Sequence, residues 1–325
     1  MRSGRRTNLA LLALVALALL TGTVSYAVGT APATTLVATA HAAAGLGLLL
    51  LVPWKQAVVR RGLSRPPHPG RGAGLLLAGL LLITVIAGLA QELVGFRTVL
   101  GLAPLQVHVI AALLAVPVIV VHLVTHPQRP RVADLSRRTA LRAGLLGLGG
   151  VAAAGATRGL GPAAQRPTGS SEVGSGSPQQ MPVTQWFTDG VPLAADRAAP
   201  LLVRGAPVGL APVAEVIAVL DCTGGWYAEQ RWAGVPLDRL LGPLPAGARS
   251  VDVVSVTGYR RRFPVAEAPR LLLATHVGGE PLSPGHGAPR RLVAPGRRGY
   301  QWVKWVVAVE VSDEPPWWQP PFPLT

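Results

Sequence analysis

The most informative stretch of the C-terminal half is residues 221–226, which read Asp221-Cys222-Thr223-Gly224-Gly225-Trp226. A β-type run ends at the cysteine, and two glycines follow shortly after it. This order predicts a side chain held at the edge of a sheet, beside backbone that a large ligand can approach closely. Because Cys222 is the only cysteine of the chain, no internal disulfide can form.

The thiol of Cys222 has three interpretations. A lone cysteine is most often a small buried apolar residue. At the edge of a sheet its thiolate is instead a nucleophile or a soft ligand for a metal. A thiol protease would need a nearby histidine, and His276 and His286 are available, but no protease motif surrounds the cysteine. The neighbouring sequence therefore argues against the buried apolar role and leaves the nucleophile and the soft metal ligand open.

The sequence around this turn is typical of a mixed, β-rich domain. Long amphipathic helices are missing, and only Pro236–Leu241 predicts a short helix. Gly and Pro turns separate short β-type runs, which include Val213–Leu220, Ser250–Val256, Arg291–Val293 and Trp302–Val311. We expect an α+β domain over residues 181–325.

Three blocks of this domain, in this order, resemble the sulfite oxidase family of molybdopterin enzymes. The first block is 221–225 followed by Gln230-Arg231-Trp232-Ala233-Gly234-Val235-Pro236-Leu237. The second is His286-Gly287-Ala288-Pro289-Arg290-Arg291-Leu292-Val293-Ala294-Pro295-Gly296, and the third is Gly299 with Val303-Lys304-Trp305. The resemblance covers about residues 180–312. It implies a sulfite oxidase-type molybdopterin-binding fold and an oxidoreductase activity.

The resemblance also implies a role for four residues. Cys222 matches the family's molybdenum-ligating, catalytic cysteine, and Lys304 matches a lysine that contacts the cofactor. His286 and Arg291 match the histidine and arginine that hold the pterin and its phosphate. Independently, an anionic phosphate suits the basic cluster formed by Arg291, Arg297, Arg298 and Lys304 in Gly-rich sequence. The alternative for this cluster is a solvated basic loop.

The substrate is less defined than the cofactor. The resemblance implies oxygen-atom transfer or related two-electron chemistry, on a small molecule, a protein sulfoxide or a sulfur oxyanion. The arginines that would recognise sulfite cannot be assigned, and the candidates are Arg204, Arg231 and Arg260–Arg262. The architecture is similar to the exported bacterial branch, which includes the catalytic subunit of protein-methionine-sulfoxide reductase. A non-catalytic binding module on a degenerate molybdopterin fold is the alternative.

Residues 1–160 predict an all-α bundle of four or five transmembrane helices. Four apolar runs are long enough to cross a bilayer, which takes about 20 helical residues. A fifth run is shorter and rich in Gly and Ala. The five are Leu9–Val28, Thr34–Val52, Ala73–Ala90, Leu105–Val124 and Leu141–Ala156. Residues 161–180 are rich in Gly, Ser, Pro and Gln, which is typical of a flexible linker.

The net charge of +15 is mainly a topology signal rather than a mark of nucleic-acid binding. Three segments hold 13 of the 30 basic residues: the N-terminus, the loop after the second apolar run, and the loop after the fourth. Under the positive-inside rule these segments lie in the cytoplasm. A fifth span then places the C-terminal domain outside the cell or inner membrane.

Two features of the N-terminal half have alternatives. The first apolar run has a basic start, so it could be a cleaved signal peptide rather than a span. The segment Ser136-Arg137-Arg138-Thr139-Ala140-Leu141-Arg142 resembles a twin-arginine export signal, with Ala140 in the place of the usual aromatic residue. Export of a folded domain suits a protein that receives its cofactor in the cytoplasm. The alternative is an ordinary basic loop.

Three histidines lie in the apolar runs, where a polar ring is costly and indicates function. We expect His41 and His108 at similar depth, so they could ligate one b-type haem. His122 lies on the same helix face as His108, a spacing that resembles two-haem membrane cytochromes, with His126 and His68 as partners. The bundle would then pass electrons to quinone or another carrier. The alternatives are histidines that only make hydrogen bonds, and a bundle that only anchors the domain.

Overall fold

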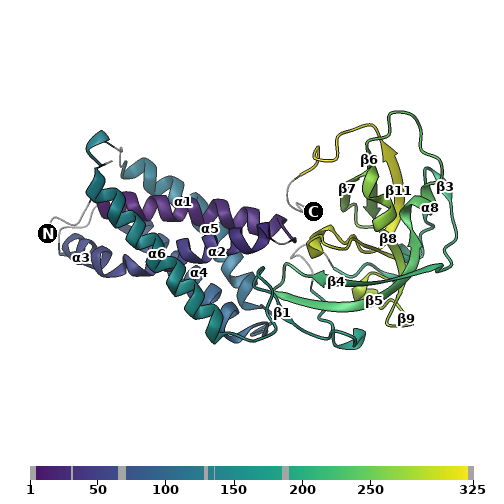
Figure 1. Cartoon of the computed structure of the whole chain (residues 1–325), viewed down its shortest axis with the longest axis horizontal. Helices are drawn as coiled ribbons and strands as arrows, with labels where there is room; N and C mark the ends of the chain where they lie inside the picture. Colours follow the sequence, from purple (N-terminus) through teal and green to yellow (C-terminus); the bar gives the residue numbers. More distant parts are fainter. Residues whose placement is uncertain are drawn as a thin grey trace. The chain divides into compact units, whose positions relative to one another are not determined.

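The computed structural model describes residues 5–30, 32–64, 71–127, 131–134, 136–184 and 190–320. The chain divides into two compact units, Met1–Ser171 and Glu172–Thr325. The first unit is helical, and the second is built mainly from strands (Figure 1). The division falls inside the segment 161–180.

The first unit is a bundle of long apolar helices. Its elements are α1 (Arg5–Ala27), α2 (Ala33–Leu50), α3 (Val52–Leu63), α4 (Arg71–Val94), α5 (Pro104–Thr125), the short 3-10 turn η1 (Val132–Asp134) and α6 (Arg137–Leu160). Five stretches are long and apolar enough to cross a membrane: α1, Ala33–Ala57, α4, α5 and α6. Each of the five apolar runs of the sequence therefore falls in such a helix.

The surface of this bundle is apolar. Helix α1 packs on α2, α2 on α6, and α4 on α5. Large side chains on the outside of these helices are more than half exposed, among them Leu20, Leu36, Ile86, Leu114 and Leu148. A water-soluble protein rarely exposes so many contiguous apolar side chains. This surface suits contact with hydrocarbon.

Two β-sheets form the framework of the second unit. In the first sheet the strand order is β1-β5-β8-β10, with β4 beside β5 and β9 beside β8; in the second it is β3-β2-β11-β6-β7. The bounds of the first set are β1 (Ser171–Glu172), β4 (Ala214–Asp221), β5 (Trp226–Pro236), β8 (Leu272–Val277), β9 (Glu280–Pro281) and β10 (Arg291–Val293). Those of the second are β2 (Leu202–Val203), β3 (Ala206–Pro207), β6 (Ser250–Ser255), β7 (Arg260–Pro264) and β11 (Val306–Ser312).

Short helical pieces complete this unit. They are η2 (Pro178–Gln180), α7 (Ala194–Arg197), α8 (Leu237–Leu241), η3 (Val265–Arg270), η4 (Pro284–His286) and η5 (Gly299–Gln301). The core between the sheets is closed by fully buried apolar side chains, including Trp232, Phe263, Leu273, Leu292 and Trp305. Side chains alternate between the two faces of β5, so one face of this strand packs into the core. The buried residues on that face are Trp226, Ala228, Gln230 and Trp232.

The sequence-based expectations for strands differ from the structure in one place. The expected strand Trp302–Val311 begins only at Val306. The backbone cannot be extended before it, since Trp305 has a φ of 52° and lies in the left-handed region. This kink leaves Val303-Lys304-Trp305 in a loop, which frees Lys304 to reach the site described below.

The segment 161–180 makes hydrogen bonds within each unit. In the first unit, the Gln91 side chain on α4 donates to the Gly169 carbonyl at 2.9 Å, and Gln165 donates to the Gln91 carbonyl at 3.2 Å. In the second unit, the Val173 amide donates to the Tyr227 carbonyl at 2.9 Å. The Gly- and Ser-rich composition of this segment thus coexists with specific backbone contacts.

Candidate functional site

Cys222 lies in the turn between β4 and β5. Its amide donates to the Trp226 carbonyl at 2.9 Å, and its carbonyl accepts from Gly225 at 3.2 Å. Gly225 has a φ of 98°, a conformation that side-chain-bearing residues rarely adopt, so the turn depends on this glycine. The cysteine is only partly buried, which leaves its sulfur accessible at the end of a rigid hairpin.

Thr184 contacts the cysteine, and the sequence did not point to it. Its hydroxyl lies 3.0 Å from the Cys222 Sγ and accepts a hydrogen bond of 3.1 Å from the Trp226 indole. The Gly224 amide also points at the sulfur, at 3.4 Å. These groups fix the orientation of the thiol. No motif marks Thr184 in the sequence, because it lies outside the regular strands and helices. Its hydrogen-bond partner Trp226, in contrast, belongs to the block around the cysteine.

His286 and Lys304 lie against the same segment as Thr184. The ammonium of Lys304 donates to the carbonyls of Gly285 at 2.8 Å and Thr184 at 3.4 Å. The His286 ring lies 2.8 Å from the Ser283 hydroxyl and 3.2 Å from the Met181 carbonyl. Burial, helped by the positive charges of Arg291 and Lys304, lowers the pKa of His286 to about 4, so its ring is neutral at pH 7.

Arg291 is a buried cation held by aromatic faces and carbonyls. It is 2% exposed, and its guanidinium carbon lies 5.2 Å from the Trp232 ring centroid and 5.7 Å from that of Trp302. It donates to the His286 carbonyl at 3.1 Å and the Trp302 carbonyl at 3.4 Å, while its buried Nε has no hydrogen-bond partner in the described part of the chain. Burial lowers its pKa to about 10, against the effect of Cys222, so the cation persists at pH 7.

The charge of Arg291 has no carboxylate against it among the described residues. A buried ion without a counter-ion is costly, and natural proteins rarely keep one unless a ligand or partner neutralises it. The cation, the neutral His286 and the partly exposed Cys222 therefore form a site suited to an anionic group.

Arg297 and Arg298, which the sequence groups with this cluster, have carboxylate partners. Arg297 pairs with Glu267, with its Nε 3.3 Å from Oε2. Arg298 pairs with Asp221, and both side chains are buried, at 3% and 4% exposure. A Cβ added to Gly299 would lie 2.9 Å from the Cys222 Cα. Arg298 and Gly299 thus pack directly behind the cysteine turn, and their contacts hold the backbone of that turn.

The arginines that were candidates for substrate recognition make contacts away from Cys222. Arg204 donates to the carbonyls of Leu241 at 3.2 Å and Pro243 at 2.9 Å, and Arg231 is an exposed residue 3.7 Å from Glu215. Arg261 donates to the Pro320 carbonyl at 2.9 Å. Arg260 is exposed on β7. Within the described part of the chain, no contact brings one of these arginines to Cys222.

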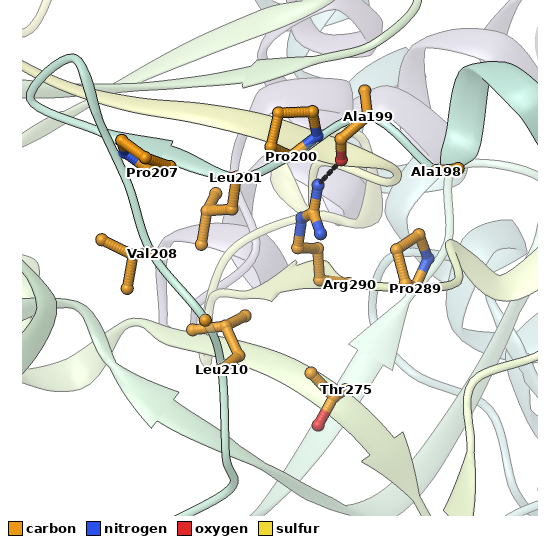
Figure 2. Close-up of a pocket in the computed structure, with 11 residues that line it drawn as sticks. Ala198, Ala199, Pro200, Leu201, Pro207, Val208, Leu210, Thr275, Pro289 and Arg290 are labelled. Atoms are coloured by element: carbon orange, nitrogen blue, oxygen red, sulfur yellow. Dashed lines mark hydrogen bonds between the residues drawn. The ribbon is translucent and has the colours of Figure 1, made fainter.

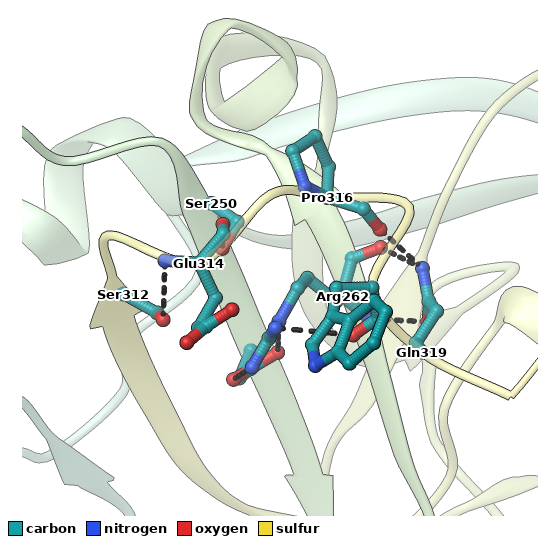
Figure 3. A network of polar contacts seen from close by, with 8 residues as sticks. Ser250, Arg262, Ser312, Glu314, Pro316 and Gln319 are labelled. Atoms are coloured by element: carbon teal, nitrogen blue, oxygen red, sulfur yellow. Dashed lines mark hydrogen bonds and ion pairs between the residues drawn. The ribbon is translucent and has the colours of Figure 1, made fainter.

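Arg262, the last of these candidates, belongs to a network that fastens residues 314–320 to the second sheet (Figure 3). Its guanidinium forms two hydrogen bonds with Asp252, at 2.8 and 2.7 Å. Its backbone amide donates to the Gln319 side chain at 2.9 Å, and Gln319 donates back to its carbonyl at 2.8 Å. The hydrogen bonds to Asp252 raise the pKa of Arg262. The side chain is therefore committed to structure.

A cavity of about 440 Å³ lies elsewhere in this unit, beside Arg290 (Figure 2). Its walls include Ala199, Leu201, Val208 and Thr275. Arg290 donates to the carbonyls of Ala199 and Val306, the latter at 2.6 Å. Cys222 does not line this cavity. The side chains of the adjacent Arg290 and Arg291 thus lie in different surroundings, because neighbouring side chains of an extended segment point in opposite directions.

In the first unit, the structure brings His41 and His108 together. Their ring centroids are 5.7 Å apart. The Nδ1 of His41 lies 3.0 Å from the Ala18 carbonyl, and the Nδ1 of His108 lies 2.7 Å from the Thr84 carbonyl. Because a carbonyl only accepts, each Nδ1 carries the proton and each Nε2 keeps its lone pair for a metal.

Glycines lie against both rings. A Cβ added to Gly22 would lie 2.9 Å from the His41 Cε1, and one added to Gly88 would lie 2.9 Å from the His108 Nδ1. His122 does not join this pair; its ring stacks on that of His126, with centroids 4.9 Å apart. His68, the other suggested partner of His122, lies outside the described residues.

Comparison with known proteins agrees with the C-terminal geometry. Residues 209–318 match the family model described as the oxidoreductase molybdopterin binding domain. This part of the chain is therefore similar to molybdopterin-binding oxidoreductase domains. Cys222, His286, Arg291 and Lys304 all lie within it.

Individual relatives match over part of their length. The protein-methionine-sulfoxide reductase catalytic subunit MsrP of Xanthomonas campestris is 31% identical over 116 residues, 30% of this chain and 36% of that protein. The nitrate reductase [NADPH] of Mycosarcoma maydis is 44% identical over 57 residues, 18% of this chain and 6% of that protein. The chain thus spans about a third or less of these relatives.

A solved structure also aligns with part of the chain. The sulfane dehydrogenase SoxCD of Paracoccus pantotrophus is 23% identical, and the alignment covers 38% of this chain and 41% of that chain with a TM-score of 0.35. Similarity at this level carries no argument about the substrate.

Proposed function

We propose that this chain is a membrane-bound molybdenum–pterin oxidoreductase with its catalytic site at Cys222. The observation that carries the proposal is the buried cation of Arg291, which lies near the cysteine and whose Nε has no partner among the residues that the structure describes. A pterin phosphate or dithiolene supplies the negative charge that this site would neutralise. When bound, the cofactor supplies two-electron redox chemistry with exchange of an oxo group.

The chain's own residues have separate roles in this proposal. Cys222 is a soft thiolate donor to molybdenum, oriented by Thr184 and the Gly224 amide. Arg291 and Lys304 bind the anionic part of the cofactor. His286, whose ring nitrogens contact Ser283 and Met181, positions the segment that carries its carbonyl bond to Arg291. Arg297 and Arg298 act on the cofactor indirectly, since their charges already face carboxylates.

Arg291→Ala tests this proposal. Loss of one partner of a charge-assisted contact costs about 2–5 kcal/mol, so we expect purified protein to contain much less molybdenum and pterin. Metal analysis and pterin fluorescence measure both. Arg290→Ala is the matched control, because it removes the same side chain from the adjacent position, and it should keep its cofactor. Equal cofactor content in the two variants would contradict the assignment.

We infer that the substrate is a neutral sulfoxide, on a protein or a small molecule, rather than an oxyanion. An oxyanion site needs a free cationic side chain beside the reacting atom. Five arginines were candidates, and each described contact commits them to carbonyls, carboxylates or the surface. The similarity to a protein-methionine-sulfoxide reductase subunit supports the same class.

We propose that the five apolar helices cross the cell or inner membrane, with the N-terminus in the cytoplasm and the catalytic unit outside. The positions of the basic segments support this orientation. Ser136 is the N-cap of α6, and the exposed Arg137 and Arg138 occupy its first turn. Positive charge there opposes the helix dipole, so these arginines do not serve helix stability. Their position is consistent with an export signal.

We propose that His41 and His108 bind one b-type haem through their Nε2 atoms. The anchored Nδ1 atoms and the glycines that face both rings support it. A bundle with this haem could carry electrons between the catalytic site and a quinone or other redox partner, whereas a bundle without it would only anchor the domain.

The haem proposal predicts a b-type spectrum that depends on His108. The variant His108→Leu should lose the reduced-minus-oxidised bands, because one axial ligand is gone, and should keep its molybdenum. His126→Leu, near the end of the same helix, is the control and should keep the bands. Protein from a haem-replete host that shows no bands at all would leave the bundle as an anchor.

A further inference from the structure

The histidine contacts of the bundle repeat along its helices. On α4 and α5, Gly88 faces His108 and Gly74 faces His122, where an added Cβ would lie 3.7 Å from the His122 ring. Fourteen residues separate the two histidines, and 14 separate the two glycines in the opposite direction. Fourteen residues make nearly four helical turns. The same glycine–histidine contact therefore recurs on the same faces of the antiparallel helices α4 and α5.

The same step applies on the other side of the bundle. His41 faces Gly22, and a step of 14 residues along each segment leads to Lys55 and Asn8. These two residues are in contact, because the Lys55 ammonium donates to the Asn8 side-chain oxygen at 3.2 Å. The rings of His41 and His108 lie together. The same step of 14 residues along both segments therefore brings Lys55 to the depth of His122. The bundle thus has a first site, His41 and His108, and a second site, His122 and Lys55.

Two differences make the second site unlike the first. Gly22 lies directly against the His41 ring, whereas Asn8 fills the corresponding position with a polar side chain bonded to Lys55. The first-site Nδ1 atoms are held by carbonyls, but among the described residues the buried Nδ1 of His122 has no hydrogen-bond partner. The His122 ring is therefore not fixed in the tautomer that an axial ligand needs.

We propose that the second site binds the head group of a membrane quinone and not a second haem. Lys55 offers an ammonium donor. His122 offers its Nδ1, which has no hydrogen-bond partner among the described residues and is a donor in the tautomer that carries its proton there. The head group of a quinone is a planar ring with two carbonyl acceptors, and its tail dissolves in hydrocarbon. This inference rests on the proposed function, since it identifies where the redox partner of the bundle binds.

The test is a titration of the full-length protein in detergent with decylubiquinone, followed by calorimetry. Loss of one charge-assisted hydrogen bond weakens binding by roughly tenfold or more. We expect that loss in both His122→Leu and Lys55→Met, which replace each polar group with an apolar side chain of similar size. Val124→Ala, at an exposed position near the same end of α5, is the control and should bind like the parent protein.

The haem content of the same samples separates the alternatives. We expect about one haem per chain in the parent protein and no change in His122→Leu. A second haem that is lost in His122→Leu would overturn the inference, and so would unchanged quinone affinity in both variants. Absence of the first-site haem would count against the proposed function instead, while the titration would still decide whether quinone binds here.

Discussion

Cys222→Ser should abolish turnover while leaving the second unit folded. Serine keeps the size of the side chain and a hydrogen-bonding atom for Thr184, which lies 3.0 Å from the sulfur. It removes the soft thiolate that a molybdenum centre needs. Loss of a group essential to the chemistry lowers kcat by about three orders of magnitude or more.

The assay uses reduced benzyl viologen as electron donor and methionine sulfoxide as acceptor. Thr223→Ser changes the neighbouring residue of the same turn by one methyl group and is the matched control, with activity expected near that of the parent. Cofactor content should fall less than activity in Cys222→Ser, because Arg291 and Lys304 remain. Undiminished turnover in this variant would remove the cysteine from the catalytic site.

Arg298→Met should destabilise the second unit strongly. The side chains of Arg298 and Asp221 are only 3% and 4% exposed, so the change leaves a buried carboxylate without its main partner. Breaking a buried pair in this way costs about 3–5 kcal/mol. For a unit of this size each kcal/mol lowers the Tm by about 2–4 °C.

Tryptophan fluorescence can follow this unfolding in the full-length protein. Of the eight tryptophans, only Trp54 belongs to the first unit, so the signal reports mainly on the second. Arg297→Met is the matched control, because its pair with Glu267 is about a third exposed and contributes about 0–1 kcal/mol. If the two variants melted together, the Arg298 pair would not be what holds the cysteine turn.

The helices of the first unit could be predicted from the sequence because their signal is local. A run of about 20 apolar residues needs a helix wherever it meets hydrocarbon, so composition alone gave all five stretches. The short helix α3 was not expected, since Val52–Leu63 carries much of the polar loop between two apolar runs. The joint position of His41 and His108 followed from their depth, which is set by residue count.

The cofactor cluster of the second unit could be predicted only in part. The blocks around Cys222, His286, Arg291 and Lys304 identified residues that the fold brings to one region. The sequence could not distinguish Arg291 from Arg297 and Arg298. The three differ in whether a carboxylate that is distant in the sequence lies against them. Glu267 and Asp221 approach those arginines only through tertiary packing, and Thr184 reaches the sulfur in the same way.

The strand Trp302–Val311 shows a second limit. Its apolar residues alternate well enough to predict a strand throughout, but the loop at Lys304 takes a left-handed turn at Trp305. Bonds from Lys304 to the carbonyls of Gly285 and Thr184 stabilise that departure. Local propensity was overridden where the chain serves the site, as is common at functional positions.

The molybdenum and pterin content of the purified full-length protein shows whether this chain carries a molybdenum–pterin cofactor. We expect about one molybdenum and one pterin per chain in protein from a host that makes the cofactor. Both should fall in Arg291→Ala and stay unchanged in Arg290→Ala. Folded protein from such a host that contains neither molybdenum nor pterin would contradict the account.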